Sequence, residues 1–281
     1  HAPIGLAFAV LALRMLPLRS DRRWRRQAVT GAVLLALSAA LMIALAPDRL
    51  KHVNLYQSIF YGVLRDSPDV RRDLEELDIP VKYAVLAGTN YFQHNTAIPQ
   101  NDAELHREVL SRLSHKDVAL FYLRHPSRFA DKLRAAAANG AYIRPAYLGN
   151  FDRTQGEPRG ALSYRYSGWS QWKAEHMPHT VGWFASCYAL FGAAAAWRWL
   201  AVSDRRSRLA LETLGVVALI GLFAVVVPLV GDGEADLGKH LFMFNVAFDM
   251  MAVSGVTAAV YVLTAFVART GRYERKTRAS V

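Results

Sequence analysis

Apolar and polar positions divide the chain into five hydrophobic stretches and one long polar segment. The hydrophobic stretches cover residues 4–18, 28–46, 180–202, 209–230 and 240–268, and the polar segment covers residues 47–179. The second stretch runs for 19 residues without a charged side chain. At about 1.5 Å per residue it is long enough to cross a hydrocarbon core about 30 Å thick. The pattern therefore predicts a mainly α, polytopic membrane protein with about five transmembrane helices.

Positive charge is concentrated at alternate ends of these stretches. Residues 19–27, 203–208 and 269–281 together hold 13 Lys and Arg but 3 Asp and Glu, a surplus of +10 out of a total of +11. By the positive-inside rule these three segments are cytoplasmic. The polar segment then lies on the outer side, and we expect a multi-pass membrane protein with the lipid bilayer as a partner.

The expected organisation has four parts. They are two transmembrane helices in residues 1–46, an extracytoplasmic domain in residues 47–179, three transmembrane helices in residues 180–268 and a basic cytoplasmic tail in residues 269–281. The first apolar stretch is short and carries its arginines after the apolar run, the reverse of a signal peptide. We interpret it as the inner part of a helix whose beginning lies outside the sequence, and the chain as a fragment of a larger protein.

The polar segment has a nearly balanced charge, with 18 basic and 15 acidic residues. Such a surface argues against nucleic acid as a partner. Periodicity predicts a mostly helical domain inserted between the second and third transmembrane helices. Residues 48–64 are typical of an amphipathic helix near the membrane surface, Asn101 is a candidate N-cap, and residues 127–139 form a helix that Gly140 ends.

Ionisable residues crowd the connection between the fourth and fifth stretches, at the outer membrane surface. They are Asp232, Glu234, Asp236, Lys239 and His240. The three carboxylates are candidate catalytic bases or ligands of a divalent cation, while the lysine and the histidine suit a lipid-linked phosphate. The alternative is a solvated hairpin loop that caps the last helix.

Asp249 lies farther along the last apolar stretch, with Asn245 one turn before it. A carboxyl group is costly in lipid, so we expect it to face the helix bundle, in a structural hydrogen bond or in an active-site or proton-relay role. Aromatic side chains recur in the glycine-rich end of the polar segment. Among them, Trp169 and Trp172 suit either sugar stacking or packing against the membrane surface.

Metal and thiol chemistry find little support in the sequence. His176 and His179 are separated by a proline, which disfavours the helical spacing that brings two imidazoles together. The other histidines of the polar segment, His115 among them, are scattered and expected at the surface. Cys187, the single cysteine, lies inside an apolar stretch where packing is its ordinary role. We assign no residue as a metal ligand.

Several long strings in the sequence carry a family resemblance. They are NLYQSIFYGVLRDSP (residues 54–68), KYAVLAGTNYF (residues 82–92) and KHLFMFNVAFD (residues 239–249), with shorter echoes in YLRHP (residues 122–126) and RPAYLGN (residues 144–150). These strings resemble the bacterial glycan-biosynthesis hexose transferases of the WsfD type. The resemblance implies a polytopic enzyme of a bacterial inner membrane, similar in plan to the GT-C class, of which this chain is the C-terminal part.

The resemblance also implies an activity. A transferase of this class takes a hexose from a polyprenyl-phosphate donor at the outer face and adds it to a cell-envelope glycan, with inversion at the sugar carbon when a carboxylate activates the acceptor hydroxyl. Residues of this chain would then contact the substrates. The donor phosphate would be bound by Lys239, His240 and Arg65, and the sugar would be contacted by Tyr91, Trp169 and Trp172. Asp249 would contact the bound substrate from within the bundle.

Other functional classes stay open. The resemblance to GT-C enzymes implies an acidic catalytic residue in the first outer loop, ahead of many further spans. We therefore expect the main base outside these 281 residues. A membrane-anchored binding or scaffold protein without catalysis is therefore the alternative. A component of a transporter has Asp249 as its one support.

Overall fold

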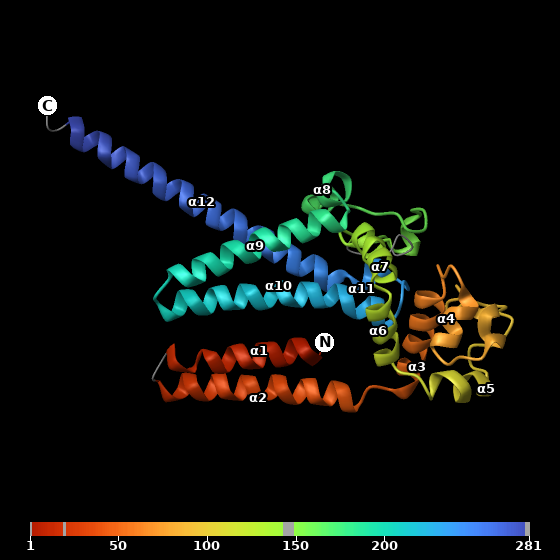
Figure 1. Cartoon of the computed structure of the whole chain (residues 1–281). Helices are drawn as coiled ribbons and strands as arrows, with labels where there is room; N and C mark the ends of the chain where they lie inside the picture. Colours follow the sequence, from red (N-terminus) through yellow and green to blue (C-terminus); the bar gives the residue numbers. More distant parts are fainter. Residues whose placement is uncertain (1, 19–20, 143–148, 279–281) are drawn as a thin grey trace.

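The computed structural model describes residues 2–18, 21–142 and 149–278, and its long helices form a bundle at one end of the molecule (Figure 1). These helices are α1 (Ala2–Arg14), α2 (Arg22–Ala44), α9 (Val181–Ala201), α10 (Arg205–Gly231) and α12 (Phe242–Arg278), and a 3-10 turn, Leu16–Leu18, follows α1. Asp21 and Asp204 accept hydrogen bonds from the first free backbone N–H groups of α2 and α10, which fixes where both helices begin.

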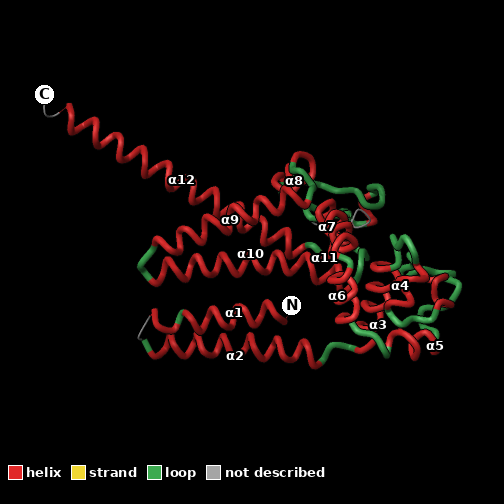
Figure 2. The backbone as a smooth tube through the Cα atoms, in the orientation of Figure 1, coloured by secondary structure: helices red, strands yellow, loops and turns green. Residues whose placement is uncertain are grey.

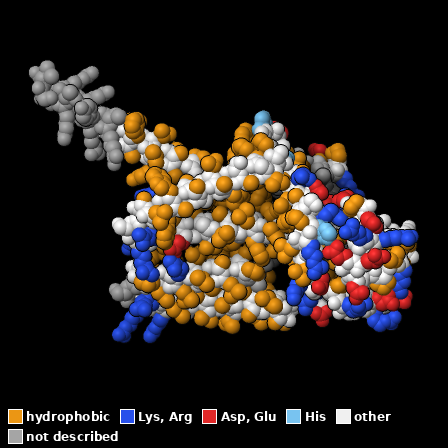
Figure 3. Space-filling view, in the orientation of Figure 1, with side chains coloured by type: hydrophobic (Ala, Val, Ile, Leu, Met, Phe, Trp, Pro, Cys, Tyr) orange, Lys and Arg blue, Asp and Glu red, His pale blue; other side chains and the backbone are white. Residues whose placement is uncertain are grey.

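Three of the described helices are long and apolar enough to cross a membrane: Arg22–Ala44, Arg205–Gly231 and Phe242–Ala268. Most of their side chains face outward, and Figure 3 shows the resulting apolar surface. Lipid is the medium that such a surface needs. The chain is thus a helical membrane protein. The short α1 and the 21-residue α9 are the other two expected spans, and a total of five stays a prediction.

The arginine-rich segments share one end of the bundle. The connection from α1 to α2 and the connection from α9 to α10 both lie at the end away from the short helices, and α12 runs toward that end as well (Figure 1). The short helices and the connection from α10 to α12 occupy the opposite end. This arrangement agrees with the charge pattern, while the side of the membrane that each end faces stays a prediction.

Residues 47–179, which we call the outer domain, consist of short helices and loops, with no strand in their described part (Figure 2). The α-helices are α3 (Asp48–Tyr56), α4 (Val70–Glu76), α5 (Ala103–Leu105), α6 (His115–Arg124), α7 (Pro126–Asn139) and α8 (Gly168–His176). Wider π-helical turns, Gln57–Val63 and His106–Leu110, continue α3 and α5, and 3-10 turns cover Val81–Leu86 and Arg153–Gln155. The mainly α fold class is confirmed.

The core of the outer domain forms around the π-helical turn Gln57–Val63. Ile59, Phe60 and Val63 are 0% exposed and belong to the same core as Phe121 of α6. Burying side chains of this size stabilises the fold by about 1.5–3 kcal/mol each. The expectation of an amphipathic helix at the membrane surface is therefore wrong for residues 57–63. Their apolar side chains fill the core of the domain instead.

A second core joins the outer domain to the bundle. Ala136 and Ala137 of α7 pack together with Phe184 of α9 and Phe244 of α12. Beyond them, a Cβ atom on Gly140 would lie 2.8 Å from a ring carbon of Phe244, a distance that side chains do not tolerate. The alanine-rich end of α7 and its glycine thus let α12 approach closely.

Some element ends differ from expectation. The side chain of Asp102, rather than Asn101, caps α5 by accepting a hydrogen bond from the N–H of Leu105 at 2.8 Å. The last long helix begins at Phe242 instead of His240, because a separate turn of helix, α11 (Leu237–His240), precedes it. α12 also continues to Arg278, into the segment expected as a tail.

Candidate functional site

The acidic connection between α10 and α12 forms a tight hairpin, residues 231–240, which we call the outer hairpin. It crosses the outer domain backbone against backbone. Gly233 has a φ of +62°, and a Cβ atom there would lie 2.8 Å from the Cα of Gly62 and 2.7 Å from the carbonyl oxygen of Gln57. Glycine is required at such a left-handed, crowded position. The two glycines therefore fix the place of the hairpin.

Asp232 ties the outer hairpin to the outer domain. Its side chain accepts a hydrogen bond from Gln57 Nε2 at 2.8 Å, and its other oxygen lies 2.9 Å from His240 Nε2. The residue is only 7% exposed. Because both carboxylate oxygens already have protein partners, Asp232 is a poor candidate for a base and a good candidate for holding His240 in place.

Glu234 is bound by two cations of the outer domain. Its carboxylate lies 2.7 Å from Lys132 Nζ and 3.2 Å from Arg65. The Lys132 side chain is only 3% exposed and also contacts Asp66 at 2.9 Å. Burial raises the pKa of Asp66, but the hydrogen bond and the charge of Lys132 outweigh it, so the pKa lies below its usual value. A buried ammonium needs such carboxylates.

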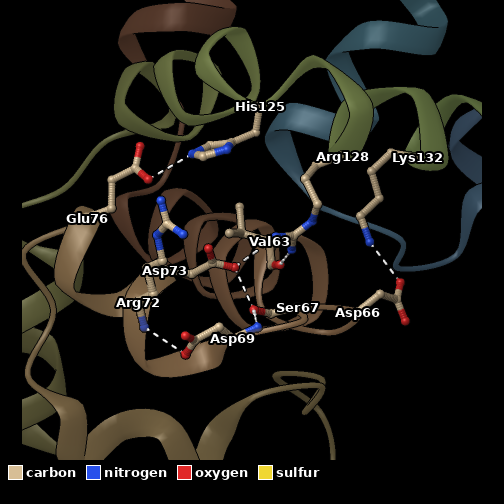
Figure 4. A network of polar contacts seen from close by, with 10 residues as sticks. All are labelled: Val63, Asp66, Ser67, Asp69, Arg72, Asp73, Glu76, His125, Arg128 and Lys132. Carbon is tan, nitrogen blue, oxygen red and sulfur yellow. Dashed lines mark hydrogen bonds and ion pairs between the residues drawn. The ribbon is translucent and has the colours of Figure 1, made fainter.

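Figure 4 shows Lys132 of α7 pointing toward Asp66, and Arg128 of α7 pointing toward Val63 and Asp73. Arg128 donates to Asp73 at 2.9 Å and to the carbonyl oxygen of Val63 at 2.6 Å. Asp73 in turn accepts a hydrogen bond from the Ser67 hydroxyl at 2.6 Å. These charge-assisted bonds hold α7 against the segment that leads to α4, and they thereby position Lys132 for Glu234.

Asp236 and Lys239 lie exposed at the tip of the outer hairpin. Neither side chain forms a hydrogen bond or ion pair with the described residues. Asp236 adopts a left-handed backbone conformation with a φ of 46° and a ψ of 40°, which aspartate tolerates better than most residues. Its carbonyl oxygen accepts from the N–H groups of Lys239 at 2.8 Å and His240 at 3.1 Å. Of the predicted carboxylates in the hairpin, Asp236 is the one available to a ligand.

His115 supports the hairpin from α6. Its Nε2 atom lies 3.1 Å from the carbonyl oxygen of Gly231. Burial lowers the pKa of His115, and the bond to Gly231 together with the charge of Asp232 opposes this shift only in part. The expected surface position holds only in part for this residue, because its ring is half-buried against the end of α10.

A second cluster lies between α8 and α12. Lys173 has a side chain that is 0% exposed, and its Nζ atom lies 2.7 and 2.9 Å from the two oxygens of Asp249. It also donates to the side-chain oxygen of Asn245. Trp169 Nε1 donates to Asp249 at 2.8 Å. Asp249 is thus neutralised by a cation of the outer domain, and Asn245 acts on the same lysine.

One comparison places the chain among known proteins. A family model described as the YfdI N-terminal transmembrane domain matches residues 1–278. The chain belongs to this family. No curated protein and no solved structure matches it. Membership in the YfdI N-terminal transmembrane domain family agrees with the apolar helices. It does not extend to the WsfD-type transferase assignment, and its description of an N-terminal domain does not support the expected placement in a C-terminal part.

The predicted site residues of this YfdI-family domain fall into three places. The outer hairpin and its partner form the first group: Asp232, Glu234, Asp236, Lys239, His240 and Arg65. The border of α8 and α12 holds the second group: Trp169, Trp172 and Asp249. Tyr91 stands apart, in a pocket of about 420 Å³ that Arg49 and His52 also line.

The two tryptophans of α8 are engaged with protein groups. Trp169 and Trp172 stack with ring centroids 5.2 Å apart, and Trp172 also stacks on His176 at 5.9 Å. The ring of Trp172 therefore has two stacked neighbours, while 47% of its surface stays exposed. Trp169 contributes through its N–H bond to Asp249.

Metal chemistry gains no support from the structure. The described parts of the chain contain no group of three or more His, Cys, Asp or Glu side chains placed to hold a metal ion. Asp232 and Glu234 have their oxygens bound to protein groups, so they do not fit a divalent cation.

Sequence reasoning missed Lys132, Lys173 and Gln57. For Lys132 a weak signal exists, because it stands four residues before Ala136 and therefore on the face of α7 that is buried. Lys173 has no such signal, because Trp169, four residues before it, is 46% exposed. The spacing of Lys132 does not show which carboxylate it binds.

Proposed function

We propose that this domain is part of a membrane glycosyltransferase that moves a hexose from a polyprenyl-phosphate donor to a cell-envelope glycan at the outer membrane face. The observation that carries the proposal is the contrast among the carboxylates of the outer hairpin. Asp232 and Glu234 are bound by outer-domain groups and hold the hairpin in place. Asp236 and Lys239 are exposed, and their side chains have no partner among the residues that the structure describes.

The chemistry assigns one role to each free group. The family resemblance implies a main base outside these residues, but within this domain Asp236 is the hairpin carboxylate available for that role. Its carboxylate takes the proton of the acceptor hydroxyl, whose oxygen attacks the anomeric carbon of the sugar. The bond from that carbon to the phosphate oxygen breaks, and polyprenyl phosphate leaves with the electron pair. Lys239 supplies a positive charge for the leaving phosphate, and His240, held by Asp232, adds a donor. A single displacement of this kind inverts the sugar carbon, and a positioned base contributes about 10²- to 10⁴-fold.

Arg65 supplies a third cation near the hairpin. Its guanidinium lies 3.2 Å from Glu234 and 4.6 Å from the ring centroid of Tyr61, and its side chain is 38% exposed. Glu234 and Tyr61 therefore orient the guanidinium while part of it still faces solvent. Arginine suits phosphate because its planar group offers two parallel donors.

The test is sugar transfer by the natural full-length protein in membranes, with radiolabelled polyprenyl-phosphate glucose, galactose and mannose as donors. Asp236→Asn should reduce turnover by about 10²- to 10⁴-fold and still fold, because asparagine also tolerates a left-handed backbone. Asp78→Asn is the matched control, since Asp78 is an exposed aspartate with a φ of 54° in the outer domain. Unchanged turnover of a correctly inserted Asp236→Asn variant would remove the proposed base.

A binding protein without catalysis is the second candidate, and the pocket around Tyr91 favours it. Arg49, His52 and His106 line this pocket, and no carboxylate does. It therefore suits an anionic glycan. This reading predicts that no donor supports transfer by the unaltered protein, while glycan binding persists and is lost in Arg49→Gln.

A further inference from the structure

The arginine-rich end of the bundle contains a polar pocket of about 410 Å³ between α1, the end of α9 and the start of α10. Its polar and aromatic lining consists of Arg14, Trp199, Ser203, Arg205, Arg208 and Glu212. The pocket lies at the opposite end of the bundle from the outer hairpin, so its ligand is independent of the proposed sugar transfer.

Arg14 and Glu212 build one wall of the pocket. Arg14 donates from Nε and from a terminal nitrogen to the two oxygens of Glu212, both at 2.7 Å. Trp199 Nε1 lies 3.4 Å from the same carboxylate. This two-pronged pair is the geometry in which arginine and carboxylate bind best. Glu212 therefore neutralises Arg14 and fixes the wall, while Arg205 and Arg208 form no direct ion pair with a described carboxylate.

Arg205 and Arg208 carry the positive charge of the pocket. Arg208 donates from Nε to the carbonyl oxygen of Val202 at 2.8 Å, and its guanidinium lies 5.2 Å from the ring centroid of Trp199. Its terminal nitrogens have no carboxylate partner among the described residues, and the same holds for Arg205. The nearby Asp204 accepts from the N–H of Ser207 as a helix cap. Three arginines and one glutamate give the pocket a formal charge of +2.

The surroundings of the pocket are apolar. Trp197 and Leu200 on the last turns of α9 are each 73% exposed, and Figure 3 shows the apolar surface of the bundle continuing up to the basic end. A small soluble anion would form no contact with this apolar surface. A molecule with an anionic head and an apolar tail satisfies both parts, because its head neutralises the arginines while its tail lies along the helices.

We propose that this pocket binds the phosphate headgroup of an anionic phospholipid. Basic pockets between membrane helices on the arginine-rich side take such headgroups. Arg205 and Arg208 contact the phosphate oxygens, and the Ser203 hydroxyl is placed to donate to the same headgroup. Arg14 and Glu212 hold the helices of the wall at the right separation.

Binding of phosphatidylglycerol, phosphatidylcholine and inorganic phosphate to the detergent-solubilised full chain tests the proposal by native mass spectrometry. Phosphatidylglycerol should bind more tightly than phosphatidylcholine. Arg205→Gln/Arg208→Gln should weaken its binding by about 30-fold, since each cation near the surface contributes about 1 kcal/mol. The matched control is Arg25→Gln/Arg206→Gln, which removes the same charge from the same end at positions that do not line the pocket.

Three results would overturn the proposal. The first is equal weakening by both double variants, which would show general attraction to a basic surface. The second is equal binding of the two lipids. The third is full displacement of phosphatidylglycerol by inorganic phosphate at equal concentration, which would make a soluble anion the ligand. Arg205→Lys/Arg208→Lys keeps the charge, so it should retain most of the affinity and keeps the test open if the glutamine variant misfolds.

Discussion

Lys132 and Lys173 are both buried lysines at the border between the outer domain and the bundle, but their partners differ. Lys132 contacts two carboxylates, Asp66 and Glu234, and Glu234 also contacts Arg65. Lys173 contacts a single carboxylate, that of Asp249, together with an amide oxygen. The first cluster keeps a charge partner for its lysine when one carboxylate is removed, and the second does not.

The difference explains where free charged groups are found. At the hairpin, the redundant contacts of Lys132 and Glu234 fix the backbone. The side chains of Asp236 and Lys239 are therefore not needed for that and can contact a ligand. At the border of α8 and α12, every ionised oxygen of Asp249 is used to keep Lys173 neutralised. We therefore expect function at the hairpin and stability at the second cluster.

The largest loss of stability should come from Asp249→Asn. This change leaves the ammonium of Lys173, which is 0% exposed, without its carboxylate, and breaking a buried pair costs about 3–5 kcal/mol. The unfolding midpoint in detergent should fall steeply. Glu175→Gln on the same helix serves as the control, because Glu175 is exposed and should change stability by less than about 0.5 kcal/mol. A small effect of Asp249→Asn would show that Lys173 reaches another partner.

Gly233→Ala should have the next largest effect, lowering the free energy of unfolding by about 2–4 kcal/mol. The left-handed backbone costs a side chain about 1–2 kcal/mol, and the close contacts with Gly62 and Gln57 add the cost of overpacking. Gly231→Ala is matched to it, since nothing lies within 4 Å of the added atom at that position. Equal midpoints for the two variants would contradict the backbone crossing.

Glu234→Gln should cost less, about 1–2 kcal/mol, because Lys132 keeps Asp66. Asp66→Asn should cost less than about 1 kcal/mol, as Asp66 is 63% exposed. The double variant should lose more than the sum, since Lys132 then has no carboxylate. Simple additivity in this double-mutant cycle would mean that the two carboxylates do not share one lysine.

The smallest effect should be a pH dependence from His115. Burial lowers its pKa in the folded protein, so the unfolded chain takes up the proton first as the pH falls. The stability that neutral His115 contributes is present above about pH 6.5 and is lost as the pH falls below that value. His115→Gln should reduce the change of the unfolding midpoint between about pH 7.5 and 5.5. His94→Gln, which alters an exposed histidine, should leave that change as it is. Identical pH profiles for both variants would contradict this role.

The sequence predicted those features that depend on local pattern. Apolar runs predicted the long helices, and Pro126 and Gly140 predicted the bounds of α7 because proline starts a helix and glycine ends one. The charge pattern placed the arginine-rich segments at one end. The turn Gln57–Val63 was assigned to the membrane surface instead of the core, since periodicity shows that a face is apolar but does not show what covers it.

The partners of the site residues could not be predicted. Asp232 and Glu234 look alike in sequence to Asp236, and they differ only because Gln57 and Lys132 reach them from 175 and 102 residues away. Such contacts depend on how α7 docks on the bundle. A single sequence does not show which helices pack together, so buried and exposed carboxylates could not be distinguished.

The central claim is that the outer hairpin faces the same aqueous side as the outer domain, opposite the arginine-rich ends. Single cysteines introduced as His94→Cys, Asp236→Cys and Arg206→Cys in a Cys187→Ala background, exposed to a membrane-impermeant maleimide on sealed cells, test it directly. We predict that the first two react and that Arg206→Cys reacts only after the membrane is permeabilised. Labelling of Arg206→Cys on sealed cells, with Asp236→Cys protected, would contradict the account.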